Sequence, residues 1–138
     1  MTQFELKEHL STDLKNITPL IMRVAEAVSE LSGSQDEAFK VKLALEEAIS
    51  NAMRHGNGLD STKVVQVFVQ ANEREIFIDV HDEGAGFDYE SIPDPTSGER
   101  PNYPSGRGIY LMRNLMDEVQ FYDAGRGVRL IKRHSPRP

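Results

Sequence analysis

Hydrophobic residues recur along this chain with two different periods, and each period predicts one kind of element. Apolar and polar positions alternate over residues 3–9, which predicts a short, half-buried strand. Apolar positions then recur at three- and four-residue steps over residues 14–31, which predicts an amphipathic helix closed by Gly33. Within that segment, Thr18 and Pro19 suit a cap and a first-turn proline if the helix restarts there.

A second helix is predicted between a capping signal and two glycines. Ser34 and Glu37 have the spacing of a capping box, and Gly56 and Gly58 are suited to end the helix. The apolar positions between them form one stripe, which we expect to face the core. The stripe consists of Val41, Leu45, Ala48, Ile49 and Ala52.

Two strands joined by a tight turn are predicted next. Residues 63–70 and 75–82 each place three β-branched residues on one face, and residues 71–74 suit the hairpin turn between them. These are Val65, Val67 and Val69 in the first strand, and Ile76, Ile78 and Val80 in the second. The same alternation places Asp82 on the face of its strand that carries the apolar side chains. We therefore expect this acid to point inward at the end of the second strand.

The regular pattern is interrupted between residues 87 and 107. This segment has four prolines and little periodicity, which predicts an irregular loop of about twenty residues. Loops of that length in compact domains are usually functional or disordered. After it, residues 109–116 predict a helix, and residues 119–123 and 128–133 predict a closing hairpin.

Length and composition limit the classes of protein to which the chain can belong. We expect its 138 residues to form one domain, spanning residues 1–138. Cysteine is absent, which excludes a disulfide framework, a thiolate nucleophile and a cysteine zinc site. The N-terminus is polar, and no uncharged apolar run approaches the ~20 residues of a spanning helix, so we expect a soluble, cytoplasmic protein without a membrane partner.

Charge is distributed unevenly along the chain, whose formal net charge is −6. Residues 1–99 hold 19 acids and 8 bases, whereas residues 100–138 hold 3 acids and 8 bases. The bases of the C-terminal segment are scattered over loops and a predicted strand rather than clustered on one helix. This pattern favours an anionic ligand or an acidic partner over direct binding of nucleic acid.

Glu47 and Asn51 are the first pair of residues with candidate chemistry. On a helix they project within ~40° of each other, and Asn51 lies ~60° outside the apolar stripe. Glu46 falls on the other side of the stripe, so the two adjacent glutamates cannot serve one site. Taken alone, the pair is typical of solvated helix residues.

Asp82 and the glycines after it form a second candidate. A carboxylate that points inward needs hydrogen-bond donors, because burial of an unpaired charge is very costly. The exocyclic amine of adenine is one such donor, and Gly84 and Gly86 allow backbone to approach a flat base and to adopt positive φ. The alternative is an acid and two glycines that merely form a turn.

Gly106, Arg107 and Gly108 precede a predicted helix and form a third candidate. Backbone N–H groups at a helix N-terminus carry partial positive charge and suit phosphate oxygens. Taken alone this signal is weak, since glycine before a helix is ordinary turn chemistry.

Together, these three segments resemble the motifs of one superfamily. The sequences EAISN (47–51), DEGAG (82–86) and GRG (106–108) resemble the N box and the two G boxes of the gyrase, heat-shock chaperone, histidine kinase and mismatch-repair ATPases. Within that superfamily, NAMRHG (51–56) and LMRNLMDEV (111–119) look like the bacterial anti-sigma-factor serine kinases. The resemblance covers almost the whole chain.

The resemblance implies a fold and a nucleotide site. The implied fold is an α+β two-layer sandwich of the Bergerat type, a mixed and mainly antiparallel sheet with helices on one face, and a flexible ATP lid at about 87–105. The implied cofactors are ATP and magnesium, with Asn51 as a magnesium ligand and Glu47 as the general base. The other contacts to ATP fall on Asp82, Gly84 and Gly86 at the adenine, and on Gly106, Arg107 and Gly108 at the phosphates.

One departure from the family pattern leaves alternatives open. Family members often have a threonine after glycine at the start of the last strand, whereas this chain has valine after Gly127, so one hydroxyl contact near the adenine is missing. One hypothesis is a protein serine/threonine kinase that sequesters a sigma factor and phosphorylates its antagonist. The alternative is a non-catalytic module that binds ATP as a structural ligand and holds a sigma factor or another regulator.

Other roles are weaker for this sequence. A detached ATP-binding half of a sensor kinase, or an ATPase, is disfavoured because no dimerisation helix or transducer domain accompanies the motifs. For the same reason we expect His55 to border the helix end beside Gly56 rather than to accept phosphate. Arg23 loosely matches an arginine that contacts partners in the family, although a solvated helix arginine is the simpler interpretation. The resemblance also suggests a homodimer.

Overall fold

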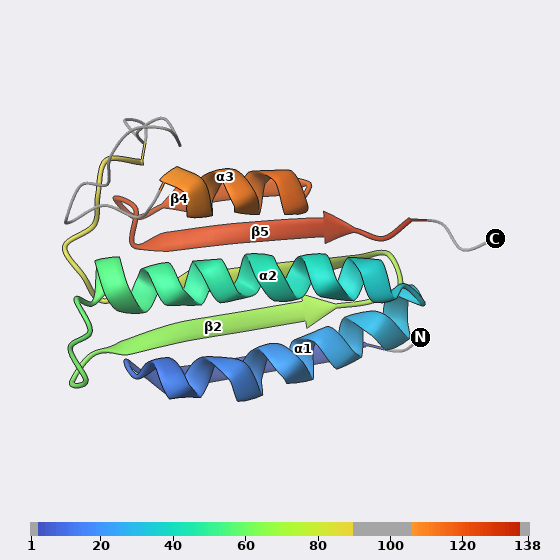
Figure 1. The fold of residues 1–138 in the computed structure, drawn as a ribbon, viewed down its shortest axis with the longest axis horizontal. Helices are drawn as coiled ribbons and strands as arrows, with labels where there is room; N and C mark the ends of the chain where they lie inside the picture. Colours follow the sequence, from blue (N-terminus) through green and yellow to red (C-terminus); the bar gives the residue numbers. More distant parts are fainter. Residues whose placement is uncertain (1–2, 90–105, 136–138) are drawn as a thin grey trace.

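The computed structural model describes residues 3–89 and 106–135, apart from the side chains of Gly106 and Arg107. Two long helices follow the first strand, and a strand hairpin, a third helix and a second strand hairpin complete the chain (Figure 1). In chain order they are β1 (Phe4–Ser11), η1 (Leu14–Asn16), α1 (Ile17–Ser32), α2 (Gln35–Asn51), η2 (Ala52–Gly56), β2 (Val64–Ala71), β3 (Glu75–His81), α3 (Gly106–Leu115), β4 (Glu118–Tyr122) and β5 (Gly127–Arg133).

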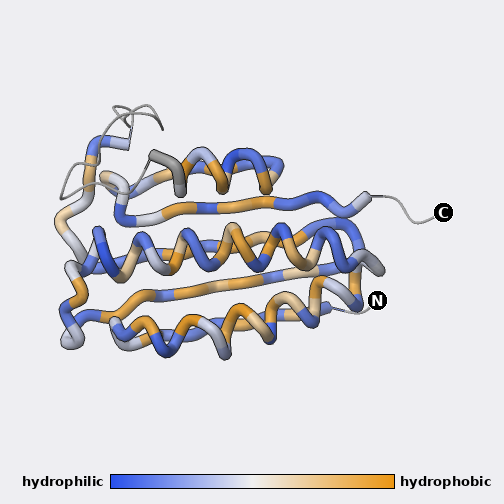
Figure 2. Tube along the Cα trace, in the orientation of Figure 1, coloured by the Kyte–Doolittle hydropathy of each residue, from blue (hydrophilic) through white to orange (hydrophobic). Residues whose placement is uncertain are grey.

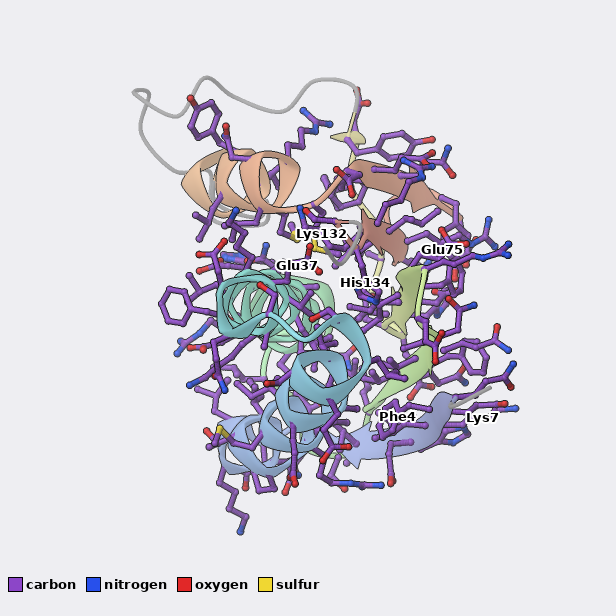
Figure 3. The ribbon with its side chains drawn as sticks, turned by 90° about the vertical axis from the view of Figure 1, so that its right-hand side faces the viewer. Phe4, Lys7, Glu37, Glu75, Lys132 and His134 are labelled. Atoms are coloured by element: carbon purple, nitrogen blue, oxygen red, sulfur yellow. The ribbon has the colours of Figure 1, made fainter. Side chains whose placement is uncertain are left out.

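The elements form two layers, which confirms the predicted α+β class. Five strands make one sheet in the order β1-β2-β3-β5-β4, and the helices cover one face of it (Figures 1 and 3). The expected sheet was mixed and mainly antiparallel; the four pairings within the described residues are all antiparallel. No helix in residues 3–89 or 106–135 is long and apolar enough to cross a membrane.

The core lies between the sheet and the helices, where the two hydrophobic periods meet. The inward face of β2 and β3 carries buried valine and isoleucine, and hydrophobic positions recur along the helices as well as along the strands (Figure 2). Leu45 and Ile49 of α2 are fully buried in this layer, and burial of each such side chain stabilises the fold by roughly 1.5–3 kcal/mol. The seven buried residues of the two strands are Val65, Val67, Val69, Ala71, Ile76, Ile78 and Val80.

The helix ends follow the sequence signals only in part. α1 begins at Ile17, so Thr18 is not its cap, although Pro19 does lie in the first turn. Its end matches the prediction, because Gly33 follows with a left-handed φ of 69°. At the start of α2, Ser34 Oγ accepts a hydrogen bond from the Glu37 N–H at 3.1 Å, which is half of the predicted capping box.

The other half of the capping box does not form, because Glu37 has stronger partners. Its Oε2 lies 2.9 Å from His134 Nδ1, and its Oε1 accepts from the Ser135 N–H at 2.8 Å. His134 Nε2 in turn lies 3.1 Å from the carbonyl oxygen of Asn72. Figure 3 shows Glu37 on its helix next to His134. The carboxylate therefore ties the segment after β5 to the first turn of α2.

Candidate functional site

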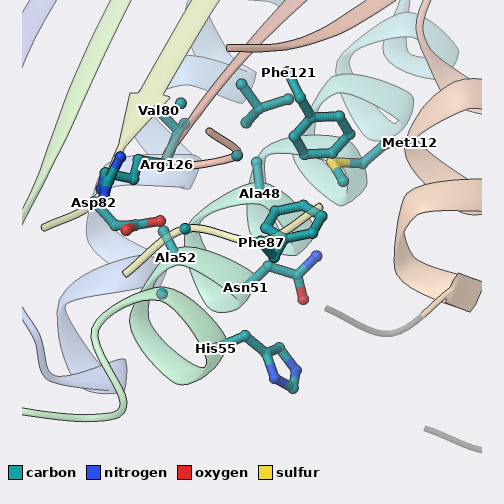
Figure 4. Close-up of a pocket in the computed structure, with 15 residues that line it drawn as sticks. Ala48, Asn51, Ala52, His55, Val80, Asp82, Phe87, Met112, Phe121 and Arg126 are labelled. Atoms are coloured by element: carbon teal, nitrogen blue, oxygen red, sulfur yellow. The ribbon is translucent and has the colours of Figure 1, made fainter. Parts of the chain in front are cut away.

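A pocket lies between α2, the C-terminal end of β3, the N-terminal end of β5 and α3 (Figure 4). Two of the predicted polar residues, Asn51 and Asp82, line it together. The remaining lining residues are Ala48, Ala52, His55, Gly56, Val80, Gly86, Phe87, Met112, Phe121, Gly125, Arg126, Gly127 and Val128.

Asp82 follows β3 and points inward, as strand alternation predicts. Its side chain is 5% exposed, and its Oδ1 accepts a hydrogen bond from the Gly84 N–H at 2.8 Å. Burial raises the pKa of the Asp82 carboxyl, against the opposing effects of the Gly84 hydrogen bond and of the nearby His81 and Arg126 charges. A buried acceptor in an apolar pocket suits a ligand with a matching donor.

Two glycines let backbone pack tightly around this carboxylate. A Cβ at Gly84 would lie 1.9 Å from the carbonyl oxygen of Gly56, and a Cβ at Gly56 would lie 2.3 Å from the Asp82 carboxylate. Gly86 has a φ of +82°, as expected, and lines the pocket. Gly84 instead packs against the end of η2 and is not among the lining residues.

Glu47 and Asn51 lie on one side of α2, next to the start of α3. A Cβ at Gly108 would lie 2.6 Å from Glu47 Oε2 and 3.4 Å from Asn51 Nδ2, so the three residues are in close contact. Glu46 is exposed, whereas Glu47 is half-buried. Burial, and then the charge of Glu46, raise the pKa of the Glu47 carboxyl. A raised pKa brings a carboxylate closer to the range of an effective general base.

The first turn of α3 faces this pair. The helix begins at Gly106, three residues before the predicted start at Ile109, so Gly106, Arg107 and Gly108 contribute first-turn N–H groups. Such groups carry the positive end of the helix dipole and attract anions. The Arg107 side chain lies outside the described residues.

A π-helical turn after α2 shapes the rim of the pocket. η2 places half-buried His55 on the lining beside Gly56, in agreement with the predicted bordering position. It also buries Asn57, which accepts from the Glu83 N–H at 2.8 Å and donates to Thr12 Oγ1 at 2.9 Å. Sequence reasoning missed the turn, because an i→i+5 helix has no propensity signal of its own.

Aromatic side chains form the apolar wall that the sequence analysis did not identify. Phe87 and Phe121 line the pocket with their ring centroids 5.4 Å apart, and Tyr89 stacks on Phe121 at 5.7 Å. Flat apolar walls with few polar groups suit a planar heterocycle. The alternation of Val119 and Phe121 in β4 was the available signal. Of the predicted lid, residues 90–105 lie outside the described part of the chain.

Comparison with known proteins agrees with this geometry. Residues 10–132 match the family described as the histidine kinase-like ATPase domain. The chain is 35% identical over 98 residues to the anti-sigma F factor of Geobacillus kaustophilus, covering 70% of this chain and 67% of that protein. It is 33% identical over 114 residues to that of Anoxybacillus flavithermus, covering 79% and 78%.

This chain belongs to the anti-sigma-factor family of histidine kinase-like ATPases. A solved structure supports the fold: the RsbU and RsbW domains of Rv1364c from Mycobacterium tuberculosis match with a TM-score of 0.60 at 16% identity. That match covers 95% of this chain and 32% of the solved chain, so the present chain spans about a third of the length of the solved one.

Proposed function

We propose that this protein is an anti-sigma factor that binds Mg-ATP in the pocket and phosphorylates a serine or threonine of an antagonist protein. The observation that carries the proposal is the contact of Glu47 and Asn51 with the first turn of α3, beside a pocket that holds buried Asp82. Asn51 and Asp82 line this cavity, and Glu47 and the first turn of α3 lie next to Asn51. We assign them the roles of magnesium ligand, acceptor for adenine, general base and phosphate site, respectively.

In the proposed complex, different parts of the pocket bind the base and the phosphates of the nucleotide. Asp82 accepts a hydrogen bond from the adenine amine, and the apolar wall of Phe87 and Phe121 packs against the base. First-turn N–H groups of α3 meet the phosphates, which are anionic acceptors. The orientation of adenine toward Asp82 directs the triphosphate toward α3, Glu47 and Asn51.

The donor set fits magnesium that arrives with the nucleotide. Mg²⁺ is commonly held by one or two protein oxygens together with phosphate oxygens and water, and Asn51 supplies an amide oxygen at the pocket. Among residues 3–89 and 106–135, no group of three or more histidine, aspartate or glutamate side chains is arranged to hold a metal by itself. When bound, the magnesium ion would neutralise part of the negative charge of the phosphates.

Glu47 performs the proton transfer in the proposed reaction. Its carboxylate accepts the hydroxyl proton of the incoming serine or threonine as the hydroxyl oxygen bonds to the γ-phosphorus. The bond between the γ-phosphorus and the bridging oxygen breaks, and ADP leaves. The raised pKa of Glu47 makes it a better proton acceptor than an ordinary exposed glutamate.

The proposed partners are a sigma factor and its antagonist, because curated relatives are anti-sigma F factors. Binding of the sigma factor requires no contact of this chain with nucleic acid, and the proposed role places it in the cytoplasm. A homodimer is part of the proposal on the same family grounds. Arg23 is exposed on α1 and pairs with Glu8 at 3.2 Å, so its simpler role is that of a solvated helix arginine.

One observation favours a second candidate, a module that binds ATP without catalysis. Val128, the residue after Gly127 at the start of β5, is buried at the pocket and offers no hydroxyl. A weaker hold on the nucleotide is compatible with a purely structural ligand. In that case partner binding depends on ATP, whereas no phosphate is transferred.

The deciding experiment is a pull-down from the source cell with and without ATP, followed by a transfer assay on the captured proteins. Purified protein, labelled ATP and magnesium are incubated with each capture, and phosphosites are located by mass spectrometry. We expect serine or threonine phosphate on one partner, lost in Glu47→Gln and kept in Glu46→Gln. The absence of transfer by all forms, with ATP-dependent capture intact, would support the structural-ligand alternative.

A further inference from the structure

The turn between β4 and β5 has an unusual backbone beside the pocket. Asp123, Ala124 and Gly125 have φ values of 52°, 55° and 85°, three consecutive residues in the left-handed region. For residues with a Cβ this conformation costs roughly 1–2 kcal/mol each and persists only where surrounding contacts hold it. The contacts around this turn are therefore informative.

Backbone hydrogen bonds join the turn to both ends of the loop that follows β3. The Asp82 N–H donates to the carbonyl oxygen of Arg126 at 2.9 Å, and the Phe87 N–H donates to the carbonyl oxygen of Ala124 at 2.8 Å. Gly86 is pressed against the same Ala124 carbonyl, since a Cβ there would lie 2.3 Å from its oxygen. Turn and loop pack as one unit.

The side chain of Arg126 completes this unit. Its Nε donates to the Gly84 carbonyl oxygen at 2.8 Å, and its terminal nitrogens donate to the carbonyl oxygens of Ala85 at 3.3 Å and Asp123 at 3.2 Å. One planar, permanently charged group thus fixes three carbonyls on two segments. Arg126 and Asp82 lie at the same end of the pocket (Figure 4).

We propose that Arg126 is a positioning residue for recognition of the adenine base, acting through Gly84 and Asp82. The guanidinium holds Gly84, whose N–H fixes Asp82 Oδ1, so the carboxylate is oriented before a ligand arrives. This inference rests on the proposed function, because it assumes that the pocket takes ATP. It assigns a role to a residue outside the motif positions that the sequence analysis identified.

The charge of Arg126 adds a second effect on Asp82. Burial raises the pKa of the Asp82 carboxyl, whereas the Gly84 hydrogen bond, His81 and Arg126 lower it and Asp123, which lies 3.5 Å from Arg126, raises it. His55 is the other titratable side chain on the lining. Only the ionised carboxylate accepts from the adenine amine without donating, so removal of the Arg126 charge is expected to move the loss of ATP binding on acidification to higher pH.

The test compares Arg126→Gln and Arg126→Lys with Arg129→Gln. Arg129 is a matched control on the same hairpin, since its guanidinium stacks over Tyr122 and lies 3.5 Å from Asp79, two residues that face away from the pocket. For each variant, the dissociation constants of ATP and GTP are measured by calorimetry across pH, and thermal unfolding reports the fold.

We expect Arg126→Gln to bind ATP about tenfold more weakly, because a charge-assisted bond of the unit is lost. The affinity for GTP, whose carbonyl faces the carboxylate unfavourably, should change much less, so the preference for ATP over GTP should decrease. The pH midpoint of ATP binding should rise. Arg126→Lys keeps the positive charge but lacks the branched donor geometry of the guanidinium. It should therefore restore the pH midpoint of ATP binding but not the preference for ATP over GTP. Arg129→Gln should behave as wild type.

Different failures have different meanings. If the wild type binds ATP and Arg126→Gln keeps both the preference for ATP over GTP and the pH midpoint of ATP binding, this inference is overturned, whereas the proposed function is not. Wild type that binds no ATP overturns the proposed function and this inference with it. If Arg126→Gln does not fold, Arg126→Lys decides: an unchanged preference for ATP contradicts the positioning role.

Discussion

The two ends of the pocket are built differently. At the end proposed to bind the adenine base (the base end), Asp82 is 5% exposed, accepts from the Gly84 N–H and lies against the turn that Arg126 holds. At the end proposed to bind the phosphates (the phosphate end), Asn51 on the lining and Glu47 beside it are half-buried on the flank of α2, in contact with the first turn of α3. One end is fixed by backbone, and the other consists of side chains at a helix surface.

This difference indicates that one end of the pocket determines nucleotide affinity and the other the rate of the proposed reaction. At the base end, the hydrogen-bonding groups are already in position before the ligand binds, so binding requires no rearrangement there. In the proposed reaction, the phosphate end must admit a hydroxyl group from another protein, which requires that the carboxylate of Glu47 be accessible. Substitutions at the two ends should therefore affect different quantities.

The largest effect is expected at the phosphate end. Glu47→Gln removes the proton acceptor and should lower the rate of phosphate transfer by about 10²–10⁴-fold, whereas ATP affinity changes little. In the wild type, the rate should rise with pH as Glu47 loses its proton, and it should do so at a higher pH than for an ordinary exposed glutamate because burial raises the pKa of Glu47. Single-turnover rates from pH 5 to 8 measure this, with exposed Glu46→Gln as the control. A rate that is insensitive to Glu47→Gln would remove Glu47 from the mechanism.

A slightly smaller effect is expected at the base end. Asp82→Asn should weaken ATP binding by about 100-fold, because a charged acceptor for the adenine amine is lost. It should also raise the free energy of unfolding at neutral pH, since the folded pKa of Asp82 is raised and its charged form opposes folding. As the pH falls through that raised pKa, wild type gains stability and the difference closes.

Urea denaturation at several pH values tests the stability half of this prediction. Asp79→Asn is the control, because Asp79 lies on β3, three residues before Asp82, and faces the other side of the sheet, where it accepts from the Tyr122 hydroxyl. A loss of stability in Asp82→Asn at neutral pH would contradict the inferred cost of burying its charge.

A smaller effect tests the contact between the phosphate end and α3. Gly108→Ala places a methyl group 2.6 Å from the initial position of Glu47 Oε2, so the carboxylate must move. We expect about a tenfold loss of transfer rate. Thermal stability should not fall, because alanine favours helix over glycine by about 1 kcal/mol. Equal rates for variant and wild type would show that the position of Glu47 is not critical.

The smallest effect is expected outside both ends, on the face of the sheet opposite the helices. Tyr122→Phe removes the 2.6 Å hydrogen bond from the Tyr122 hydroxyl to Asp79 and should cost about 1 kcal/mol of stability, with ATP affinity unchanged. Burial and the Asp79 carboxylate raise the pKa of Tyr122 to about 12. The stability that the protonated Tyr122 hydroxyl contributes is therefore complete below about pH 10 and is lost as pH rises through about 12. Ultraviolet titration of the wild type and variant checks this; an ordinary tyrosine transition would contradict it.

Much of the fold was predictable because it depends on local periodicity. The period of two in β2 and β3 and the stripe of α2 define which residues form the core, and the same alternation turned Asp82 inward. The early start of α3 was missed, since Gly-Arg-Gly has low helix propensity and tertiary contacts overrode it.

The supporting contacts of the site were not predictable from one sequence. Arg126 meets Gly84, which lies 42 residues earlier, and Asn57 meets Thr12 and Glu83, which lie 45 and 26 residues away. Nothing in the local pattern of a turn arginine or a loop asparagine indicates such partners. The motif residues were identifiable by type and spacing, whereas the residues that hold them depend on how the chain folds.

The most direct test of the division between the two ends is a parallel calorimetric titration of wild type, Asp82→Asn and Glu47→Gln with Mg-ATP. We predict that wild type and Glu47→Gln bind with dissociation constants within about threefold of each other, and that Asp82→Asn binds about 100-fold more weakly. Equal affinity of Asp82→Asn and wild type, or a loss in Glu47→Gln as large as that in Asp82→Asn, would contradict the assignment of binding to one end and chemistry to the other.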